Sequence, residues 1–343
     1  MKTAIYYNNH DVRVEDRPVP ELHEGEILVQ SKACGVCVSD TMEWYLAPRA
    51  PLPRGHEAAG IIVKIGPGVT NFKVGDRVAV HHHIACMRCE HCRKGNFTLC
   101  ESFKRSNIEP GGFAEYFKAS REHVLTSTLL LPDHVSYEAG TLVEPLACVV
   151  HAIRKAQVQP GDKVVLIGTG VMGLMFIETL RHWGVDDLLV YEVLDWRMQQ
   201  ALEAGATTVL KPSADPKDEI QRVREHFGGS LGDKIFIAAK DLRAMELGMQ
   251  LVQGGGTVVF FATPMPEEWI KLYPSHLFFN EITLTSSYSA NHIDIRTALD
   301  LISNGVINIE KLITHRYPLE KLSDAILQTV SRDSSLKCIV TFE

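Results

Sequence analysis

Lys163-Val164-Val165-Leu166-Ile167-Gly168-Thr169-Gly170-Val171-Met172-Gly173 is the stretch that decides the fold of this chain. A short apolar run leads into a GxGxxG turn, and residues 171–183 continue with helical spacing, which is the start of a βαβ unit. The first glycine permits a tight turn, the second lets the backbone approach a pyrophosphate, and the third lets helix and strand pack closely. Without the strand and the helix, a plain glycine-rich turn would be the better interpretation. The expected dinucleotide-binding residues are Gly168, Gly170, Val171, Met172 and Gly173.

The chain beyond this stretch alternates between short apolar runs and helical segments. The expected strands are 163–167, 188–191, 235–237 and 257–261, and the expected helices are 171–183, 196–204 and 242–251. Such alternation predicts βαβ units with a parallel sheet. The fold class is therefore α/β, with a doubly wound parallel sheet in this part of the chain.

A carboxylate ends the second expected strand. Glu192 lies nineteen residues after Gly173. A carboxylate at this place hydrogen-bonds a ribose 2′-hydroxyl and repels a 2′-phosphate, which favours NAD over NADP. Arg197 follows five residues later and weakens this preference, because a guanidinium can accept a phosphate. We count Glu192 and Arg197 among the cofactor-binding residues and expect NAD.

Four cysteines lie close together in the pattern Cys86-x2-Cys89-x2-Cys92-x7-Cys100, and residues 86–100 are called the cysteine segment below. Four thiolates in one short loop match a closed, four-coordinate structural zinc site. A ferredoxin-type cluster would have three residues before its fourth cysteine and proline after it, whereas seven residues intervene here. A zinc module for nucleic acid would need a basic surround, but this segment is mixed in charge. The neighbouring His81, His82, His83 and His91 are expected to be solvated or packing side chains.

A second group of ligand types lies nearer the N-terminus. Cys37 is followed by Gly55-His56-Glu57, and a thiol, an imidazole and a carboxylate can hold zinc with one position left open. Cys34 and Cys37 could instead form a redox pair, but that motif opens a helix in a βαβ unit. Residues 1–145 carry short β-like runs broken by glycine and proline. We therefore predict Cys37 as a metal ligand and Cys34 as a small buried side chain on a strand.

Length and composition limit the functional classes. The 343 residues suggest two domains, and the net charge of −7 argues against nucleic acid or an anionic membrane as the main partner. No apolar run approaches the roughly 20 residues of a membrane helix, and the first residues read as a strand rather than a signal peptide. A cytoplasmic location is the expectation. The eight cysteines are then expected to be reduced, which favours metal binding over disulfides.

These motifs together resemble a known family. Gly55-His56-Glu57-x2-Gly60-x5-Gly66-x2-Val69 matches the zinc signature of the medium-chain zinc alcohol dehydrogenases, and the segment 35–40, the cysteine segment and the GxGxxG turn occur in the same order in that family. The resemblance covers essentially the whole chain. It implies a GroES-like, mostly β catalytic zinc domain at residues 1–147 and 289–343, with a Rossmann NAD-binding domain at 148–288 inserted into it.

Residues 142–148 resemble the "EPL" segment of the sorbitol and threonine dehydrogenase branch, the polyol branch of the family. The resemblance implies that Cys37, His56 and Glu57 bind the catalytic zinc, and that Glu144 binds it or contacts its water. Glu57 and Glu144 are then catalytic residues as well. Two zinc ions per chain follow, one in this site and one in the cysteine segment.

Ser39 resembles the family hydroxyl that takes the substrate proton, so it is also predicted to be catalytic; its alternative role is a helix N-cap. Many relatives carry a relay histidine five residues after the ligand cysteine, where this chain has Met42. The proton must then leave through water, ribose or a carboxylate such as Glu57.

The expected activity is transfer of hydride between a secondary alcohol (a polyol, sugar or cyclitol) and NAD, with zinc polarising the hydroxyl. One alternative is an amino-alcohol dehydrogenase of the threonine type. Another is a non-catalytic NAD-binding or redox-sensing protein on the same fold, which should have lost the open-site ligands. The resemblance implies a homodimer or homotetramer, with residues 282–288 as a candidate edge for pairing. Pocket candidates, each more often a packing residue, are Trp44, Tyr45, Phe103, Arg105 and Asn107.

Overall fold

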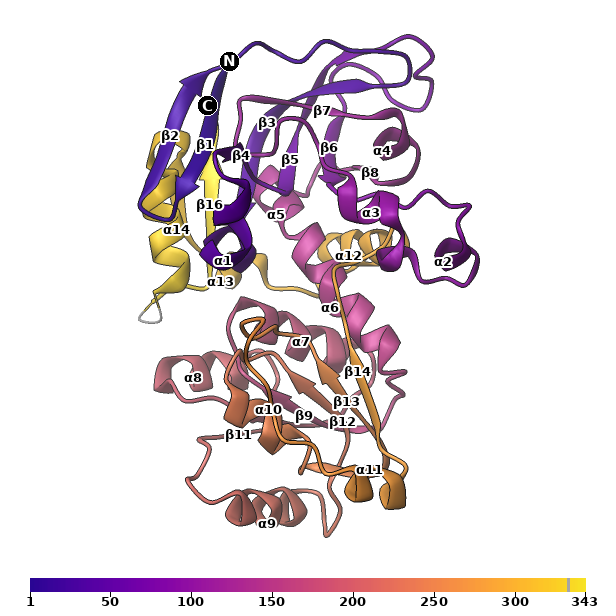
Figure 1. The fold of residues 1–343 in the computed structure, drawn as a ribbon, viewed down its shortest axis with the longest axis vertical. Helices are drawn as coiled ribbons and strands as arrows, with labels where there is room; N and C mark the ends of the chain where they lie inside the picture. Colours follow the sequence, from indigo (N-terminus) through magenta and orange to yellow (C-terminus); the bar gives the residue numbers. More distant parts are fainter. Residues whose placement is uncertain (332–333) are drawn as a thin grey trace. The chain divides into compact units, whose positions relative to one another are not determined.

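The computed structural model describes residues 1–331 and 334–343, which form two compact units (Figure 1). The first unit comprises Met1–Ala147 and Ala290–Glu343, and the second comprises Cys148–Ser289. The first boundary falls inside helix α6 (Val143–Lys155). None of the helices in the described part of the chain has the length and hydropathy that a membrane span requires.

The second unit is built on a six-stranded sheet whose strand order is β11-β10-β9-β12-β13-β14. All neighbouring strands are parallel, and the order reverses between β9 and β12, so the predicted doubly wound α/β fold is confirmed. The strands are β9 (Lys163–Ile167), β10 (Asp187–Tyr191), β11 (Thr208–Leu210), β12 (Gly232–Ile237), β13 (Val252–Phe260) and β14 (Thr283–Ser286). The helices are α7 (Val171–His182), α8 (Asp195–Glu203), α9 (Pro216–His226), α10 (Leu242–Gly248) and α11 (Pro274–Asn280).

The central strand β9 has the predicted bounds and is buried from Val164 to Ile167. Such a continuous apolar run is typical of a parallel strand that is covered on both faces. The helix predicted over 242–251 ends earlier, at Gly248, and the next strand, β13, begins at Val252.

The glycine turn after β9 has the geometry that its sequence predicts. Gly168 has a φ of +100°, a conformation that favours glycine. A Cβ atom on Gly173 would overlap the carbonyl oxygen of Gly168, whereas a Cβ atom on Gly170 would lie 3.9 Å from Arg197 Nη1, an ordinary van der Waals contact. The third glycine therefore lets α7 pack on the turn, and the second leaves space beside the helix N-terminus.

The first unit contains two sheets. The smaller has the order β2-β1-β4, and the larger has the order β15-β16-β3-β5-β6-β8, with β7 also paired to β3. The strands are β1 (Lys2–Asn8), β2 (Asp11–Asp16), β3 (Ile27–Val36), β4 (Leu52–Pro53), β5 (Glu57–Ile65), β6 (Arg77–His81), β7 (Tyr116–Ala119), β8 (Thr128–Leu130), β15 (Ile313–Pro318) and β16 (Lys337–Thr341).

Short helices connect and cover these strands. They are η1 (Val38–Thr41), α1 (Glu43–Leu46), η2 (Ala47–Arg49), α2 (Glu90–Arg93), η3 (Phe97–Leu99), α3 (Glu101–Arg105), α4 (Arg121–Thr126), α5 (Tyr137–Thr141), α12 (Asp294–Ser303), α13 (Ile309–Leu312), η4 (Leu319–Lys321) and α14 (Leu322–Val330). Helix α5 contacts β3, β5 and β6, and it leads directly into α6.

The C-terminal strand joins the N-terminal half of this unit. β16 pairs antiparallel with β3, so Cys338 lies opposite Val36 and Val340 lies opposite Cys34. Cys34 is fully buried on β3, as predicted. Residues about 300 positions apart thereby share one core.

Replacing Gly173 by alanine tests the glycine turn. Because the new methyl group would overlap the Gly168 carbonyl, we expect Gly173→Ala to cost about 1–3 kcal/mol and to lower the Tm of the protein by several degrees. Gly170→Ala is the matched control, since its methyl group would make an ordinary contact with the end of the Arg197 side chain, and its Tm should stay within about 1 °C of the wild type. Equal melting temperatures for both variants would show that α7 does not pack on the turn in this way.

Candidate active site and metal centres

Strand β5 begins at Glu57 and places this carboxylate between two neighbouring strands. The register puts Gly35 of β3 on one side of Glu57 and His81 of β6 on the other. A Cβ atom on Gly35 would overlap the Glu57 carboxylate, so glycine is needed there to let the side chain lie across β3. Glu57 is 1% exposed. A buried carboxylate in this position requires a compensating charge.

Lys337, the first residue of β16, supplies part of that charge. Its ammonium group forms an ion pair with Glu57, and its side chain is 3% exposed. Burial opposes the charged amine, but the Glu57 carboxylate and Cys37 raise the pKa of Lys337, so the amine stays protonated. Among the described residues, no group other than Lys337 donates to the Glu57 oxygens. The carboxylate therefore keeps lone pairs for a further cation.

Cys37, His56 and Glu57 lie together, as the sequence predicts. One ligand atom from each residue lies within 4.8 Å of the others. Burial, followed by the nearby Glu57 carboxylate, raises the pKa of the Cys37 thiol to about 11. A thiolate beside a carboxylate in this environment needs a divalent cation, and Cys, His and Glu are zinc ligands. The donor set and the buried negative charge therefore fit a zinc ion.

Asp40 supports two of these ligands. It is 1% exposed, accepts a hydrogen bond from the Cys37 backbone N–H at 3.0 Å, and pairs with Arg54 at 2.8 Å. Its Oδ1 atom lies 3.6 Å from His56 Nδ1. A carboxylate behind a ligand histidine fixes the orientation of the ring and directs Nε2 toward the metal.

Ser39 is the second residue of the short helix η1, which begins directly after Cys37. The N-cap of this helix is Cys37, so the alternative role of Ser39 as an N-cap is not found. The Ser39 hydroxyl lies near the Cys37 sulfur and works against the effects that raise the pKa of the thiol. Met42 follows at the end of η1 and offers no group for proton transfer.

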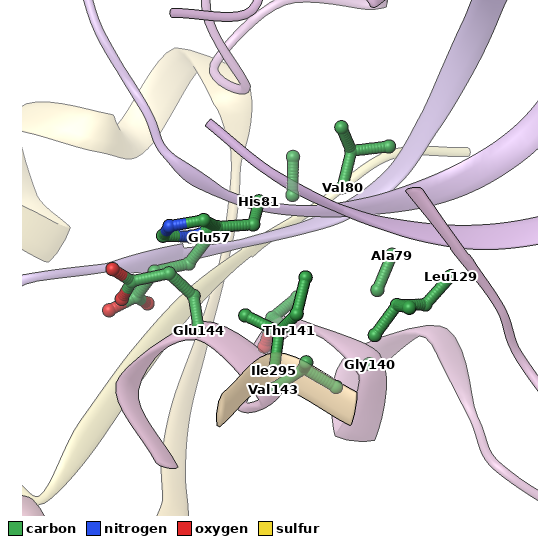
Figure 2. Close-up of a pocket in the computed structure, with 11 residues that line it drawn as sticks. Glu57, Ala79, Val80, His81, Leu129, Gly140, Thr141, Val143, Glu144 and Ile295 are labelled. Carbon is green, nitrogen blue, oxygen red and sulfur yellow. The ribbon is translucent and has the colours of Figure 1, made fainter. Parts of the chain in front are cut away.

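Glu144 lies in the first turn of α6 and belongs to a second cluster. Its carboxylate groups with His81 and His82, with ligand atoms within 4.8 Å of one another. Burial raises the pKa of Glu144 to about 8, and Glu57 and Cys37 add to this effect while His56 opposes it. Figure 2 shows the side chains of Glu57, His81 and Glu144 directed into one small space. His81, His82 and Glu144 thus stand beside the Cys37 group, and His81 is not solvated.

The four cysteines of residues 86–100 converge on one point. Their sulfur atoms lie within 4.8 Å of one another, with Cys89–Cys92 at 3.5 Å and Cys86–Cys92 at 4.0 Å. A tetrahedron with zinc–sulfur bonds of about 2.3 Å has sulfur–sulfur edges of about 3.8 Å. Burial opposes a thiolate at Cys100, but backbone N–H groups of Cys86 and Phe103 lower its pKa to about 6. The geometry fits a closed four-sulfur zinc site.

Glu192 has a structural contact that the sequence does not reveal. Its Oε2 atom accepts hydrogen bonds from the N–H and hydroxyl groups of Thr169 at 3.0 and 2.7 Å. Its Oε1 atom accepts from the N–H groups of Val193 and Leu194 at 2.7 and 3.1 Å. A carboxylate has about four acceptor sites, so a ribose hydroxyl must share or displace one of these bonds. Glu192 therefore also holds the glycine turn in place.

The remaining predicted cofactor residues lie around the same turn. Val171 and Met172 begin α7 and are partly buried. The Arg197 guanidinium lies over the Trp196 ring, with 5.0 Å to the ring centroid, and reaches toward Gly170. Positive charge is thus present beside the N-terminus of α7, where anions bind.

The predicted pocket residues have mixed locations. Phe103 is 1% exposed and packs on His83, with ring centroids 4.7 Å apart. Arg105 is exposed and pairs with Glu101, and Asn107 is exposed as well. Trp44 and Tyr45 are exposed on α1. Phe103 is therefore a packing residue, and the other four are exposed.

Four residues at the site had no function predicted from the sequence: Lys337, His81, Asp40 and Arg54. A lysine that begins the apolar run Lys337-Cys338-Ile339-Val340 is itself a signal, because a buried lysine needs a carboxylate partner. The three consecutive histidines at the end of a strand are a second signal. His81 is the last residue of that strand, so it must lie opposite a residue of the neighbouring strand. The pairing of Asp40 with Arg54 carries no signal in one sequence.

Comparison with known proteins gives consistent matches. The family of the alcohol dehydrogenase GroES-like domain matches residues 23–133, and the zinc-binding dehydrogenase family matches residues 171–304. Sorbitol dehydrogenase of Bombyx mori is 30% identical over 94% of this chain and 93% of its own length. 2R,3R-butanediol dehydrogenase of Bacillus subtilis is 29% identical, with a TM-score of 0.87 over 100% of this chain and 99% of that one. A protein of Sinorhizobium meliloti described as a zinc-binding dehydrogenase, solved with bound NADP, is 26% identical, with a TM-score of 0.89 over 99% of both chains.

Replacing Gly35 by alanine tests the position of Glu57. The added methyl group displaces the carboxylate, so we expect Gly35→Ala to retain the zinc of the cysteine segment and to lose most of the second zinc ion. Metal content per chain, measured by inductively coupled plasma mass spectrometry after gel filtration, reports this loss. Gly60→Ala is the matched control, because its methyl group would strain the same strand pair against Gln30 without meeting Glu57. Loss of zinc in both variants would make strain in the sheet, and not Glu57, the cause.

Proposed function

This chain belongs to the medium-chain zinc-dependent alcohol dehydrogenases, and we propose that it oxidises a polyol-type secondary alcohol with NAD. It is an oxidoreductase that depends on zinc and a nicotinamide dinucleotide. The observation that carries the proposed chemistry is the group Cys37, His56 and Glu57, in which three zinc-ligand atoms lie within 4.8 Å of one another in the protein interior. The polyol class is supported by the sorbitol dehydrogenase and butanediol dehydrogenase relatives.

The first unit is proposed as the catalytic zinc domain and the second as the NAD-binding domain. Cys37, His56 and Glu57 would hold the catalytic zinc, with Glu144 as an alternating ligand or water contact. The four cysteines Cys86, Cys89, Cys92 and Cys100 would hold the structural zinc, which gives two ions per chain. When bound, the catalytic zinc acts as a Lewis acid that lowers the pKa of a substrate hydroxyl.

The protein side chains have separate parts in this proposed reaction. Asp40 keeps His56 in its ligand orientation, and Lys337 holds Glu57 beside Cys37. The Ser39 hydroxyl, which lies near the Cys37 sulfur, would accept the proton that the substrate hydroxyl loses. Since Met42 cannot pass the proton on, water, the cofactor ribose or the Glu57 carboxylate completes its path. When bound, the nicotinamide would supply the acceptor for the hydride that the substrate carbon loses.

The cofactor is proposed to be NAD, bound through Gly168, Gly170, Val171, Met172 and Gly173. The carboxylate of Glu192 is the support for this preference, because hydrogen bonds from Thr169 help to keep its pKa low despite burial. An ionised Glu192 repels a ribose 2′-phosphate. Arg197 lies near the same turn and limits the discrimination, and the Sinorhizobium relative was solved with NADP.

A cytoplasmic homodimer or homotetramer is proposed for the native state. The described cysteines form no disulfide bonds, and a reducing compartment keeps thiols in this form. β14 is the last strand of its sheet. Trp269, Phe278 and Phe279 in the same unit are 73%, 77% and 80% exposed. Large exposed apolar side chains near an open sheet edge support pairing with a second copy.

A substrate panel tests the proposed activity. Purified protein is mixed with NAD and polyols, sugars, cyclitols or amino alcohols, and NADH formation is followed by absorbance with and without a zinc chelator. We expect turnover with at least one vicinal polyol, loss of turnover after chelation, and a higher kcat/KM with NAD than with NADP. Turnover of threonine-type substrates alone would favour the amino-alcohol alternative, and zinc-loaded protein without turnover would favour a non-catalytic one.

Two substitutions in η1 test the proton path. We expect Ser39→Ala to lower kcat for alcohol oxidation by about 100-fold or more, because general acid–base groups contribute about 10²–10⁴ in rate. Met42→Ala should change kcat by less than about threefold, since the side chain cannot carry a proton. Single-turnover kinetics with deuterated alcohol identify the hydride step. Equal losses in both variants would exclude a special part for Ser39.

The assembly state is tested with the exposed phenylalanines. Sedimentation velocity should give a dimer or tetramer for the wild type, and Phe278→Ser combined with Phe279→Ser should shift it toward the monomer because apolar area is lost from the interface. Leu125→Ser is the control, as Leu125 is 62% exposed in the other unit. A wild-type monomer would contradict the proposed assembly.

A further inference from the structure

His81 and His82 form a continuous cluster with the proposed catalytic zinc ligands. His81 lies opposite Glu57 in the pairing of β5 with β6. The His82 ring contacts the rings of both His81 and His56, with centroids 5.0 and 4.8 Å apart. The His81 and His82 side chains therefore lie between the group of Cys37, His56 and Glu57 and the Glu144 carboxylate.

Both histidines present an unused nitrogen inside the protein. His81 Nε2 donates its proton to the carbonyl of Ala290 at 3.2 Å, which leaves Nδ1 as a bare acceptor. That Nδ1 atom, and the Nδ1 atom of His82, are buried and accept no hydrogen bond from the described residues. His81 is 3% exposed. A histidine that gives one N–H to a backbone carbonyl and turns the other nitrogen inward is typical of a metal ligand.

Glu144 completes the donor set, and a space of ionic size lies beside Glu144 and His81. Its carboxylate lies within 4.8 Å of one nitrogen of each histidine. Glu57, His81, Thr141 and Glu144 are among the residues lining a cavity of about 10 Å³ (Figure 2). That volume is close to the minimum for one water or one small ion, and it is far too small for an alcohol substrate. Two histidines and a glutamate are a donor set of zinc enzymes.

The charges limit this region to one divalent ion. Cys37, Glu57 and Glu144 can supply at most three negative charges to a bound metal, and the Lys337 ammonium already pairs with Glu57, so a single Zn²⁺ neutralises the group. A second Zn²⁺ would leave two uncompensated positive charges in the interior, which is strongly unfavourable. The two donor sets therefore compete for the same ion.

We propose that His81, His82 and Glu144 form a second position for the catalytic zinc ion, next to Cys37, His56 and Glu57. The ion exchanges Cys37 and His56 for the two further histidines and stays inside the protein. This inference rests on the proposed zinc site but not on the substrate. It assigns a metal-binding function to two histidines that the proposed reaction does not use.

Zinc content of ligand variants tests the second position. The wild type should hold two zinc ions per chain, counting the cysteine segment. Cys37→Ser combined with His56→Ala removes two ligands of the first position, and we expect two ions per chain to remain, with the second lost to a chelator at a concentration at least tenfold lower than in the wild type. Adding Glu144→Gln or His82→Gln to this double variant should leave one ion per chain.

His83→Gln in the same double variant is the matched control, because His83 Nδ1 contacts the carbonyl of Ser106 and faces another partner. It should retain two ions. One ion per chain in the double variant alone, or two ions after Glu144→Gln and His82→Gln, would overturn the second position. Three ions in the wild type would overturn the sharing of one ion. Circular dichroism and the persisting ion of the cysteine segment confirm folding, and alcohol oxidation by the wild type separately decides the proposed function.

Discussion

The first unit depends on one buried electrostatic constraint: Glu57 lies inside a sheet, beside a thiol and a second carboxylate. Burial raises the pKa of Cys37 to about 11 and that of Glu144 to about 8, so negative charge accumulates there only if positive charge balances it. Lys337 supplies one unit through its ion pair with Glu57. The remainder fits a divalent cation, and the thiol, imidazole and carboxylate donors select zinc. A cation that replaces the protons on these groups would therefore stabilise the folded interior.

The strand topology creates this constraint. β5 carries Glu57 between Gly35 of β3 and His81 of β6, and β16 brings Lys337 next to β3. Helix α5 contacts the same strands and leads into α6, which begins with Glu144 in its first turn. Every charged member of the cluster is thus fixed by a strand end or a helix start. Rigid elements of this kind hold ligand atoms more precisely than mobile loops.

Short sequence patterns predicted the features that depend on residues close together in the chain. The glycine turn, the cysteine segment and the grouping of Cys37 with His56 and Glu57 follow from short spacings, and the structure brings each set together. Lys337 lies 280 positions after Glu57, and only the β16–β3 pairing makes them neighbours. His81 was expected to pack or be solvated because strand register cannot be read from one sequence. Glu192 was predicted as a cofactor ligand. Its four hydrogen bonds to Thr169, Val193 and Leu194 were not predicted, because they depend on the conformation of the glycine turn.

X-ray absorption at the zinc edge measures the central claim most directly, because it counts sulfur and lighter neighbours around each ion. A four-sulfur site together with a site of Cys37, His56, Glu57 and one water predicts an average of about 2.5 sulfur and about 1.5 nitrogen or oxygen neighbours per zinc. This spectrum must accompany two zinc ions per chain. One ion per chain with four sulfur neighbours would contradict the account, since the buried charges around Glu57 would then be balanced without a metal.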